Sequence, residues 1–481
     1  MPLRITLSWC RSPALLLAAA ACGLGAGQPE KNLRLESFDK DPQWDGHNNR
    51  IGENNPVTVR QDFGYDQDSP FRGPGIGGLV TTAAAPAYYA KKLPPRTLSD
   101  SLSASGKIIV PKGGVNALIG FFNDSTLNEW RTPNTIALRI AGRGDSFYAY
   151  VEYCTARWRA GGIFPSEKPG AQRLQFPSGD TPHQWELRYD PTTRTISATM
   201  DDQALSGKVR ADHVADGLTV NHFGIFNCLK SDNNHRGSVW ISDVKIDGQA
   251  QRLDHDPEWH ARNNRRTYEG HDVRPRFNFG YSPTHFAAGA ASGEMGGIVF
   301  RGDERFPERM AYYGDRLEDL TLDQPLEASG RVALLRGVTD SAVMLGFFHS
   351  KDSIRPGTAQ KQGSPYDFLG VVIEGPSREG FYFYPSYATD VEGEKGSAKG
   401  DLPRIYPDGN SHAWSLKYDP AGAEGHGSIT VKFDQKTCWL NLKPEARKTG
   451  AHFDRFGIVT TRVDGNEETI YFDDLTYTAR K

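Results

Sequence analysis

An aromatic and acidic pattern in the first half of the chain could bind a sugar. Strand-forming residues dominate the segment 147–153 (Phe-Tyr-Ala-Tyr-Val-Glu-Tyr), and the side chains of a strand point alternately to two faces. If the odd-numbered residues face a core, Tyr148, Tyr150 and Glu152 share the opposite face. Aromatic rings cover the C–H surfaces of a sugar, while polar groups bind its hydroxyls. The pattern therefore predicts a saccharide-binding face.

Two further segments fit the same chemistry. In the second half, Phe381 and Phe383 are predicted core residues, which leaves Tyr382 and Tyr384 facing outward. The run Arg157-Trp158-Arg159 places cations beside an aromatic ring, and guanidinium groups suit the carboxylate of an acidic saccharide. The predicted substrate-binding residues are Tyr148, Arg157, Trp158, Tyr382 and Tyr384. The alternative is structural, because exposed tyrosines on a sheet often only pack across strands.

If the site is catalytic, Tyr150, Glu152 and His222 are the candidate acid and base of a lyase or hydrolase. His222 precedes Phe-Gly-Ile at 223–225, and it faces away from the core if Phe223 and Ile225 face into it. At the matching place in the second half stands Arg455. A surface histidine, or one whose hydrogen bonds are all satisfied, is the structural alternative for His222.

The elements that position these residues belong to an internal repeat. Short motifs of the first half recur in the same order in the second half, and their separation grows slowly, as loop insertions would make it. The paired segments are 41–44 and 256–259, 48–50 and 263–265, 62–65 and 278–281, 76–80 and 295–299, 87–89 and 311–313, 120–122 and 346–348, 185–191 and 414–420, and 223–225 and 456–458. Such a period is too long for a solenoid unit, so each repeat is expected to be a domain.

The repeated Asn-Asn-Arg at 48–50 and 263–265 has a structural interpretation. Asparagine side chains cap turns, and each arginine is expected to hold a loop to Asp41 or Asp256.

Within each repeat the pattern is that of β-strands. Large apolar and charged residues alternate at 185–189, before an Asp-Pro-Thr turn, and the segment 428–433 alternates in the same way. The segments 239–246 and 470–477 are the predicted closing strands of the two repeats. Since no long stretch has helical periodicity, strands at this spacing predict a β-sandwich of roughly 220 residues per repeat.

The layout of these motifs resembles the concanavalin A-like (laminin G-like) jelly-roll superfamily. The similar features are the opening Phe-Asp-x-Asp-Pro-x-Trp, the Trp-x-Leu-x-Tyr-Asp-Pro strand and turn, the Phe-Gly-Ile strand and the closing strand. The resemblance implies an all-β fold with two tandem jelly-roll domains, at 28–248 and 249–481, after a signal peptide at 1–27. It also implies that the fold is compatible with a structural calcium ion. Asp243, Asp473 and Asp474 are expected near strand ends, where carboxylates suit such a cation, but no metal ligand is assigned.

The superfamily contains lectins, carbohydrate-binding modules, glycoside hydrolases, polysaccharide lyases and adhesion domains, so the fold leaves function open. The Glu-x-Asp-x-x-Glu strand of one group of retaining glycosidases is absent, as are the motif strands of alginate lyases. The leading hypothesis is recognition of an extracellular polysaccharide. The alternatives are a glycoside hydrolase or polysaccharide lyase, and a non-catalytic surface or adhesion protein.

Composition and the N-terminus limit the partners. The 481 residues carry a formal net charge of −3 with both signs interspersed, which argues against a nucleic-acid partner. Residues 1–27 have basic residues, a short apolar run and small residues, as in a signal peptide, and the run is too short for a membrane span. A second interpretation, lipidation of Cys22, rests on Ala-Ala-Ala-Cys at 19–22. We therefore expect a periplasmic, secreted or outer-membrane lipoprotein location.

Three cysteines remain after this segment, and their spacing indicates neither a zinc site nor a disulfide framework. Cys154 and Cys228 lie in the same repeat and are expected either to pair or to be buried thiols.

Overall fold

The structure is a computed structural model that describes residues 33–50, 55–128, 131–158, 162–163, 174–229, 235–272, 277–357, 363–375, 380–391 and 394–479. The predicted signal peptide, the candidate lipid anchor at Cys22 and Arg159 lie outside the described residues, and those expectations stay predictions.

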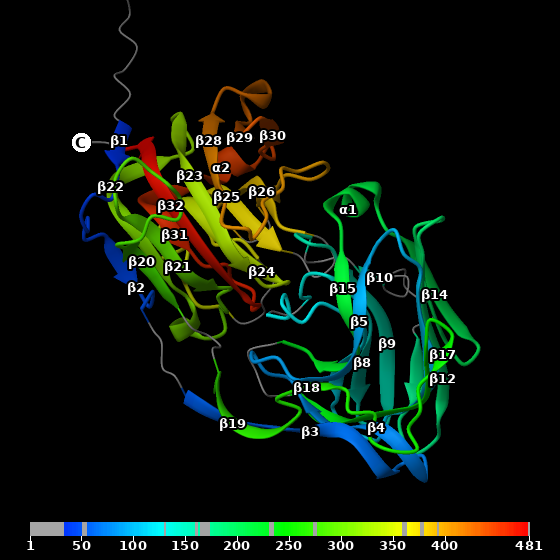
Figure 1. The fold of residues 1–481 in the computed structure, drawn as a ribbon. Helices are drawn as coiled ribbons and strands as arrows, with labels where there is room; N and C mark the ends of the chain where they lie inside the picture. The colour runs from blue at the N-terminus through cyan, green and yellow to red at the C-terminus, as the bar shows by residue number, and fades with distance from the viewer. Residues whose placement is uncertain are drawn as a thin grey trace, which may run out of the picture.

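The predicted all-β fold is confirmed. The α-helices within the described ranges are the short α1 (Ala211–Asp216) and α2 (Ala446–Thr449), and two 3-10 turns lie at Pro307–Arg309 and Ala423–Gly425. Neither α-helix has the length or the apolar character to cross a lipid bilayer. The other regular structure of the described residues consists of antiparallel sheets, which form two sandwiches (Figure 1).

The first sandwich is built from sheets 1 and 2. Sheet 1 has the strand order β14 (Gln203–Lys208), β13 (Thr195–Met200), β12 (His183–Asp190), β6 (Leu102–Ile109), β16 (Arg236–Ile246), β4 (Gly73–Thr81), β3 (Asn55–Ser69) and β19 (Arg265–Asp272), with β17 (Gln249–Ala250) beside β16. Sheet 2 has the order β10 (Gly162–Ile163), β9 (Ser146–Cys154), β8 (Thr135–Arg143), β7 (Asn116–Phe122), β15 (Thr219–Asn227), β5 (Tyr88–Thr97) and β18 (His260–Arg262), with β11 (Gln175–Pro177) beside β9.

The second sandwich is built from sheets 3 and 4. Sheet 3 has the order β20 (Asn278–Ser282), β21 (Glu294–Phe300), β32 (Glu467–Thr478), β23 (Leu326–Gly337), β28 (Ser411–Asp419), β29 (Ser428–Phe433) and β30 (Lys436–Asn441), with β1 (Leu33–Glu36) beside β32. Sheet 4 has the order β2 (Asp45–His47), β22 (Tyr312–Thr321), β31 (His452–Val459), β24 (Ser341–Phe348), β25 (Phe368–Gly375), β26 (Tyr382–Ala388) and β27 (Lys395–Ser397).

The two sandwiches have matching strand orders. The path β14-β13-β12-β6-β16-β4-β3 of sheet 1 corresponds to β30-β29-β28-β23-β32-β21-β20 of sheet 3. In the same way, β9-β8-β7-β15-β5-β18 of sheet 2 corresponds to β26-β25-β24-β31-β22-β2 of sheet 4. Strands that carry the repeated sequence motifs therefore occupy equivalent places in the two sandwiches.

The opening segment of each repeat belongs to the other repeat's sandwich. β1 and β2, at the start of the chain, pair with β32 and β22 of the second sandwich, and Figure 1 shows both in blue beside it. Conversely, β18, from the start of repeat two, pairs with β5 of the first sandwich. The two crossing segments pair with each other, because residues 55–62 of β3 lie antiparallel to β19. The repeat boundary near residue 248 stays a prediction, and the sheets cross it in both directions.

The repeated Asn-Asn-Arg motif holds this exchange together. The Asn49 side chain donates to the carbonyl of Phe279 (2.6 Å), and Arg50 donates to the Tyr281 carbonyl (2.7 Å). In the other direction, Asn264 donates to the Phe63 carbonyl (2.6 Å) and Arg265 to the Tyr65 carbonyl. The structural interpretation of the motif is thus supported, but the expected partners Asp41 and Asp256 were wrong, because each arginine binds the Phe-Gly-Tyr strand of the opposite repeat.

The Asp-Pro-x-Trp motif packs across the exchange as well. The Tyr89 hydroxyl donates to the Asp256 carboxylate (2.6 Å), and the ring of Trp259 stacks on Tyr89 with 5.9 Å between centroids. Trp44 lies 5.8 Å from Tyr313, the equivalent residue of Tyr89. The Asp-Pro-x-Trp motif of each repeat therefore contacts the repeated segment 87–89 or 311–313 of the other repeat.

The predicted strands form as expected. β12 shows strict alternation of buried and more exposed residues, with Trp185, Leu187 and Tyr189 in the core of the first sandwich. β29 spans the predicted 428–433, and the two predicted closing strands lie in β16 and β32. The cysteines Cys154, Cys228 and Cys438 are buried thiols, so the suggested Cys154–Cys228 disulfide is not formed.

Candidate functional site

A pocket lies on the outer face of sheet 4 in the second sandwich. Phe383 of β26 packs against Trp414 and Phe433 of sheet 3, so this residue faces the sandwich interior. Its neighbours Tyr382 and Tyr384 point the opposite way and line the pocket, as predicted from the alternation. The cavity has a volume of about 700 Å³, within the usual range of small-molecule sites, roughly 300–1,000 Å³.

Strand register sets the floor of the pocket. Ala342 of β24, Glu374 of β25 and Tyr382 of β26 stand side by side in one row. Met344, Val372 and Tyr384 form the next row on the same face. The floor is thus apolar in part, with one carboxylate and two phenol rings.

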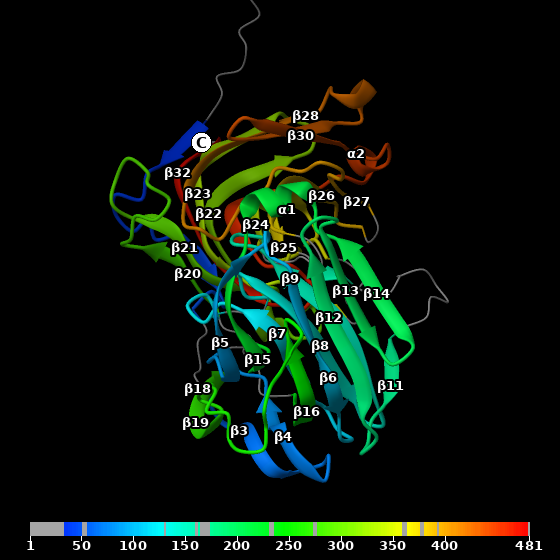
Figure 2. The same ribbon diagram turned by 45° about the vertical axis from the view of Figure 1, so that its right-hand side comes forward.

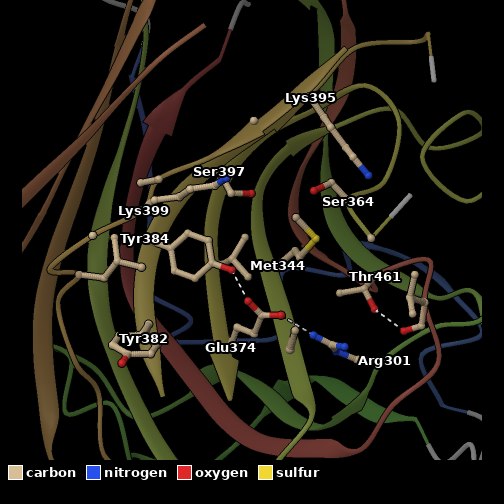
Figure 3. A pocket seen from close by; sticks show the side chains of 18 residues that line it. Arg301, Met344, Ser364, Glu374, Tyr382, Tyr384, Lys395, Ser397, Lys399 and Thr461 are labelled. Carbon is tan, nitrogen blue, oxygen red and sulfur yellow. Dashed lines mark hydrogen bonds and ion pairs between the residues drawn. The ribbon is translucent and has the colours of Figure 1, made fainter. Parts of the chain in front are cut away.

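Glu374 is held from two sides, as Figure 3 shows. Arg301, which follows β21, donates to one carboxylate oxygen (2.5 Å), and the Tyr384 hydroxyl donates to the other. Arg301 also contacts Asp340 (3.3 Å). A carboxylate with a charged partner and a phenol donor has a fixed orientation, which is what a site needs in order to read the hydroxyl pattern of a ligand.

Burial and the charge of Glu374 raise the pKa of Tyr384 well above its ordinary value. The phenol is therefore protonated at neutral pH, and it acts as a hydrogen-bond donor in the pocket.

Hydroxyls and lysines complete the lining. Ser364, Ser397 and Thr461 contribute hydroxyl groups, and Lys395 and Lys399 contribute ammonium groups (Figure 3). Among the described lining residues, the cations are Arg301, Lys395 and Lys399, and the carboxylate is that of Glu374. The pocket therefore has a positive balance of charge, although the whole chain is slightly acidic.

The first sandwich carries the equivalent pair of tyrosines. The repeated Gly-Phe-Phe motif aligns the strands of the two sandwiches. In this alignment, Tyr150 pairs with Arg139 of β8 at the position where Tyr384 pairs with Val372 of β25. Tyr148 and Tyr150 have near-parallel rings with centroids 6.2 Å apart, and both side chains are half-buried. The predicted outward face of β9 is confirmed, because its odd-numbered residues from Phe147 to Tyr153 lie in the core.

Glu152 shares that face but is enclosed. Its side chain is 2 % exposed and forms ion pairs with Arg139 (3.1 Å) and Arg131 (3.6 Å). It lies beneath the segment that contains Arg131, among the apolar residues Leu118, Leu127 and Phe226. This environment is that of a buried structural ion pair, since a ligand cannot reach the carboxylate without moving this segment.

His222 does not join Tyr150 and Glu152. It lies on β15, and β7 and β8 separate this strand from β9, a distance of roughly 14 Å at the usual strand spacing. The predicted set of acid and base is therefore not brought together. His222 instead contacts Asn221 (2.7 Å) and His260 (2.8 Å).

Arg157 and Trp158 lie where the two sandwiches meet. Trp158 is 2 % exposed and packs against Tyr382 and Tyr406, with 6.2 Å between centroids in each case. Arg404 of the second sandwich lies 4.7 Å above the Trp158 ring and pairs with Asp212 of the first. Arg157 pairs with Asp216 (2.7 Å) and lies over Tyr406. The indole is enclosed by protein, so the predicted sugar-binding role of Trp158 was wrong.

Sequence reasoning missed several pocket residues. Arg301, Glu374, Lys395 and Lys399 stand in segments without a repeated motif. A weak signal exists for Glu374, because it is the one charge in the otherwise apolar strand β25. The lysines stand in or just after the short strand β27, which no pattern indicated.

Within the described parts of the chain, Asp124, His222 and His260 are a group of side chains that could hold a metal ion. The aspartates considered for calcium have other partners. Asp473 accepts from the backbone N–H of Gly289 (3.1 Å), Asp474 accepts from that of Ala290, and Asp243 pairs with Lys107 (2.7 Å).

No protein-family model matches the sequence, and no curated protein matches it. Among solved structures, mouse laminin α1 domains LG4-5 match at 11% identity over 89% of this chain and 91% of that one, with a TM-score of 0.24. An alginate lyase of Pseudomonas aeruginosa matches at 11% identity over 39% of this chain and 86% of that one, with a TM-score of 0.25. Peanut lectin matches at 13% identity over 44% and 98%, with a TM-score of 0.21. All three scores are low, so the fold assignment depends on the strand pairing described above.

Proposed function

We propose that this protein binds an acidic oligosaccharide in the pocket on the outer face of sheet 4. The observation that carries the proposal is the hydrogen-bonded set of Glu374, Arg301 and Tyr384 on the pocket floor. Each member keeps a fixed orientation, and together they offer donors and an acceptor at one end of an aromatic surface.

The chemistry of the lining fits a sugar. The rings of Tyr382 and Tyr384 supply aromatic surface for sugar C–H groups, and Ser364, Ser397 and Thr461 supply hydroxyls that both donate and accept. The equivalent tyrosines of the first sandwich occupy a similar face, but the register places Ala141 at the position of Glu374, and the carboxylate on that face, Glu152, is enclosed. We therefore assign the binding site to the second sandwich.

The charge of the lining favours an acidic ligand. Arg301 is paired with Glu374 and Asp340, whereas Lys399 is an exposed residue at the rim. Lysine ammonium groups at a rim attract carboxylates or sulfates and hold them by hydrogen bonds.

The lining favours binding over hydrolysis. Among the described residues of the pocket, Glu374 is the one carboxylate, whereas most glycoside hydrolases use two, placed on either side of the scissile bond. The high pKa of Tyr384 also keeps its phenol protonated, which does not suit a base at neutral pH.

Titration calorimetry with an oligouronate and a neutral oligosaccharide of equal length tests the proposal. We expect the acidic ligand to bind more tightly, and the double variant K395A/K399A to lose roughly tenfold in affinity, about 1.4 kcal/mol. Higher salt is expected to weaken binding, because the lysines are near the solvent.

The matched control is Lys417→Ala, an exposed lysine on β28 in the opposite sheet, which should leave the affinity unchanged. Equal loss in this control, or no binding of either oligosaccharide, would contradict the proposal. Release of unsaturated products that absorb in the ultraviolet would show a lyase and overturn the assignment of a pure binding site.

A further inference from the structure

Three potential metal ligands meet on the outer face of the first sandwich. They are Asp124, which follows β7, His222 of β15 and His260 of β18, and one ligand atom from each lies within 4.8 Å of the others. The Nε2 atom of His222 lies 2.8 Å from Nδ1 of His260. Because β18 comes from the start of repeat two, the cluster joins the exchanged segment to the sheet that receives it.

Hydrogen bonds orient the His222 ring for this role. Its Nδ1–H donates to the side-chain oxygen of Asn221 (2.7 Å), which leaves the lone pair of Nε2 directed toward His260. Asn221 in turn donates to the Asp124 carboxylate (2.7 Å). Metal-binding histidines in proteins are usually held in this way, with the second ring nitrogen donating to an oxygen.

Aromatic packing fixes the position of both imidazoles. The Phe122 ring stacks on His222 at 5.4 Å, and Tyr88 contacts both His222 and His260. The Tyr88 hydroxyl lies 3.4 Å from Nδ1 of His260. His222 is 1 % exposed, whereas His260 is an exposed residue and Asp124 is half-buried, so the cluster can be reached from solvent.

The second sandwich has different residues at the positions equivalent to His222 and His260. The strand registers align His222 with Arg455 and His260 with Asp45. There the Arg455 guanidinium pairs with Asp45 (2.8 Å) and with Asp454 (3.2 Å). The second sandwich thus fills this position with a cation between carboxylates.

The first sandwich has two histidines where the second has Arg455 and Asp45. Its two imidazoles face each other beside the Asp124 carboxylate, which lies 3.8 Å from Nδ1 of His222. A cation bound between the imidazoles and the carboxylate would supply the positive charge that Arg455 supplies in the second sandwich.

We infer that Asp124, His222 and His260 bind one divalent first-row transition-metal ion, of which Zn²⁺ is the natural probe. Two imidazole nitrogens and a carboxylate oxygen are a common donor set for such ions, with water in the fourth position. Ligand atoms of one tetrahedral zinc lie roughly 3.4 Å apart at bond lengths of about 2.0–2.1 Å. The two imidazole nitrogens, 2.8 Å apart, would have to separate by roughly 0.6 Å, and the His260 ring lies on the exposed edge strand.

The ion would attach the exchanged segment to the first sandwich. A ligand set drawn from β15, the loop after β7 and β18 exists only when this exchange is in place. Zn²⁺ binding is therefore expected to stabilise the folded chain and to raise its thermal midpoint.

The experiment uses the full chain after dialysis against a chelator. Bound metal is measured by elemental mass spectrometry after addition of Zn²⁺ and gel filtration, and the thermal midpoint is measured with and without Zn²⁺. We expect about one Zn²⁺ per chain, a midpoint that rises with Zn²⁺, and a loss of at least tenfold in Zn²⁺ affinity in H260Q. Because His260 is exposed, this variant should fold, and D124N provides a second test with the same expected loss.

The matched control is H452Q in the second sandwich, which removes an exposed histidine paired with one aspartate, Asp319 (3.1 Å). Undiminished Zn²⁺ binding in this variant, with loss in H260Q and D124N, supports the site. Equal Zn²⁺ binding in all four proteins, or no binding to the unaltered chain, would overturn it and leave a plain histidine–histidine hydrogen bond.

Discussion

At the scale of single residues, two glutamates of the second sandwich have different roles. Glu374 lies on the outer face in contact with Arg301 and Tyr384. Glu468 lies inside, fully buried, and accepts a hydrogen bond from Ser341 (2.8 Å). The strand position of each residue decides which one faces the pocket.

Glu468 should make stability depend on pH. Burial raises its pKa to about 8, so the folded chain keeps this proton up to about pH 8, whereas the unfolded chain loses it near pH 4.5. The stability that this group contributes is therefore present at pH 5 and falls as the pH rises toward 8. We expect E468Q to gain stability relative to the unaltered chain over this range, on the order of 2–4 kcal/mol, measured by urea unfolding at each pH. A constant difference between the two proteins would contradict this.

Glu152 is expected to matter for stability. E152A leaves Arg131 and Arg139 without the buried carboxylate that they share, and breaking such a pair costs about 3–5 kcal/mol. Urea unfolding of E152A measures this cost, and E186A on the exposed face of β12 is the control. Unchanged stability in E152A would show that the two arginines do not depend on this residue.

Residue types and alternation predicted which side chains point away from the core, and this was right for Tyr148 and Tyr150, whereas Tyr382 and Tyr384 line the pocket but are themselves buried. They could not predict what covers those side chains. The enclosure of Glu152 and Trp158 comes from segments distant in the sequence, and a local pattern carries no information about them.

At the scale of elements, the exchange of opening segments organises the molecule. Each repeat contains both the Asp-Pro-x-Trp segment and the strand that receives it, so a chain with two copies can pair them within a repeat or between repeats. The contacts of Trp44 with Tyr313 and of Trp259 with Tyr89 show the pairing between repeats. Sequence comparison predicted the motifs but not this choice, because both pairings satisfy the same contacts.

The exchange predicts crossed effects of mutations. W259A, in repeat two, should loosen the first sandwich, and W44A, in repeat one, should loosen the second. Removal of such a packed indole costs about 3–5 kcal/mol where it is buried. Hydrogen-exchange mass spectrometry should show faster exchange in β5 for W259A and in β22 for W44A. The opposite assignment of the two effects would contradict the exchange.

At the scale of the whole molecule, the sandwiches also meet through side chains. Trp158 lies under Arg404 and beside Tyr382, and the Arg404–Asp212 ion pair crosses the same interface. Figure 2 shows α1, which carries Asp212, next to the second sandwich. The exchanged segments and this side-chain interface both join the two sandwiches. We therefore expect the sandwiches to unfold together.

Trp158→Ala should weaken that coupling. We expect calorimetry to show a single transition for the unaltered chain and two separated or broadened transitions for W158A, because the interface loses its main apolar contact. Oligosaccharide affinity should fall only slightly, since Trp158 itself does not line the described pocket and contacts it at Tyr382. Complete loss of binding with an unchanged single transition would restore the sugar-binding role that the sequence suggested.

Two matched tyrosines test the placement of the binding site in the second sandwich. Tyr384 and Tyr150 occupy equivalent places on the outer faces of the two sandwiches, and each is changed to phenylalanine, which keeps the ring and removes the hydroxyl. Calorimetric titration with an oligouronate should show affinity at least tenfold lower in Y384F and within about twofold of the unaltered chain in Y150F. Full affinity in Y384F, or a loss confined to Y150F, would contradict the placement of the binding site in the second sandwich.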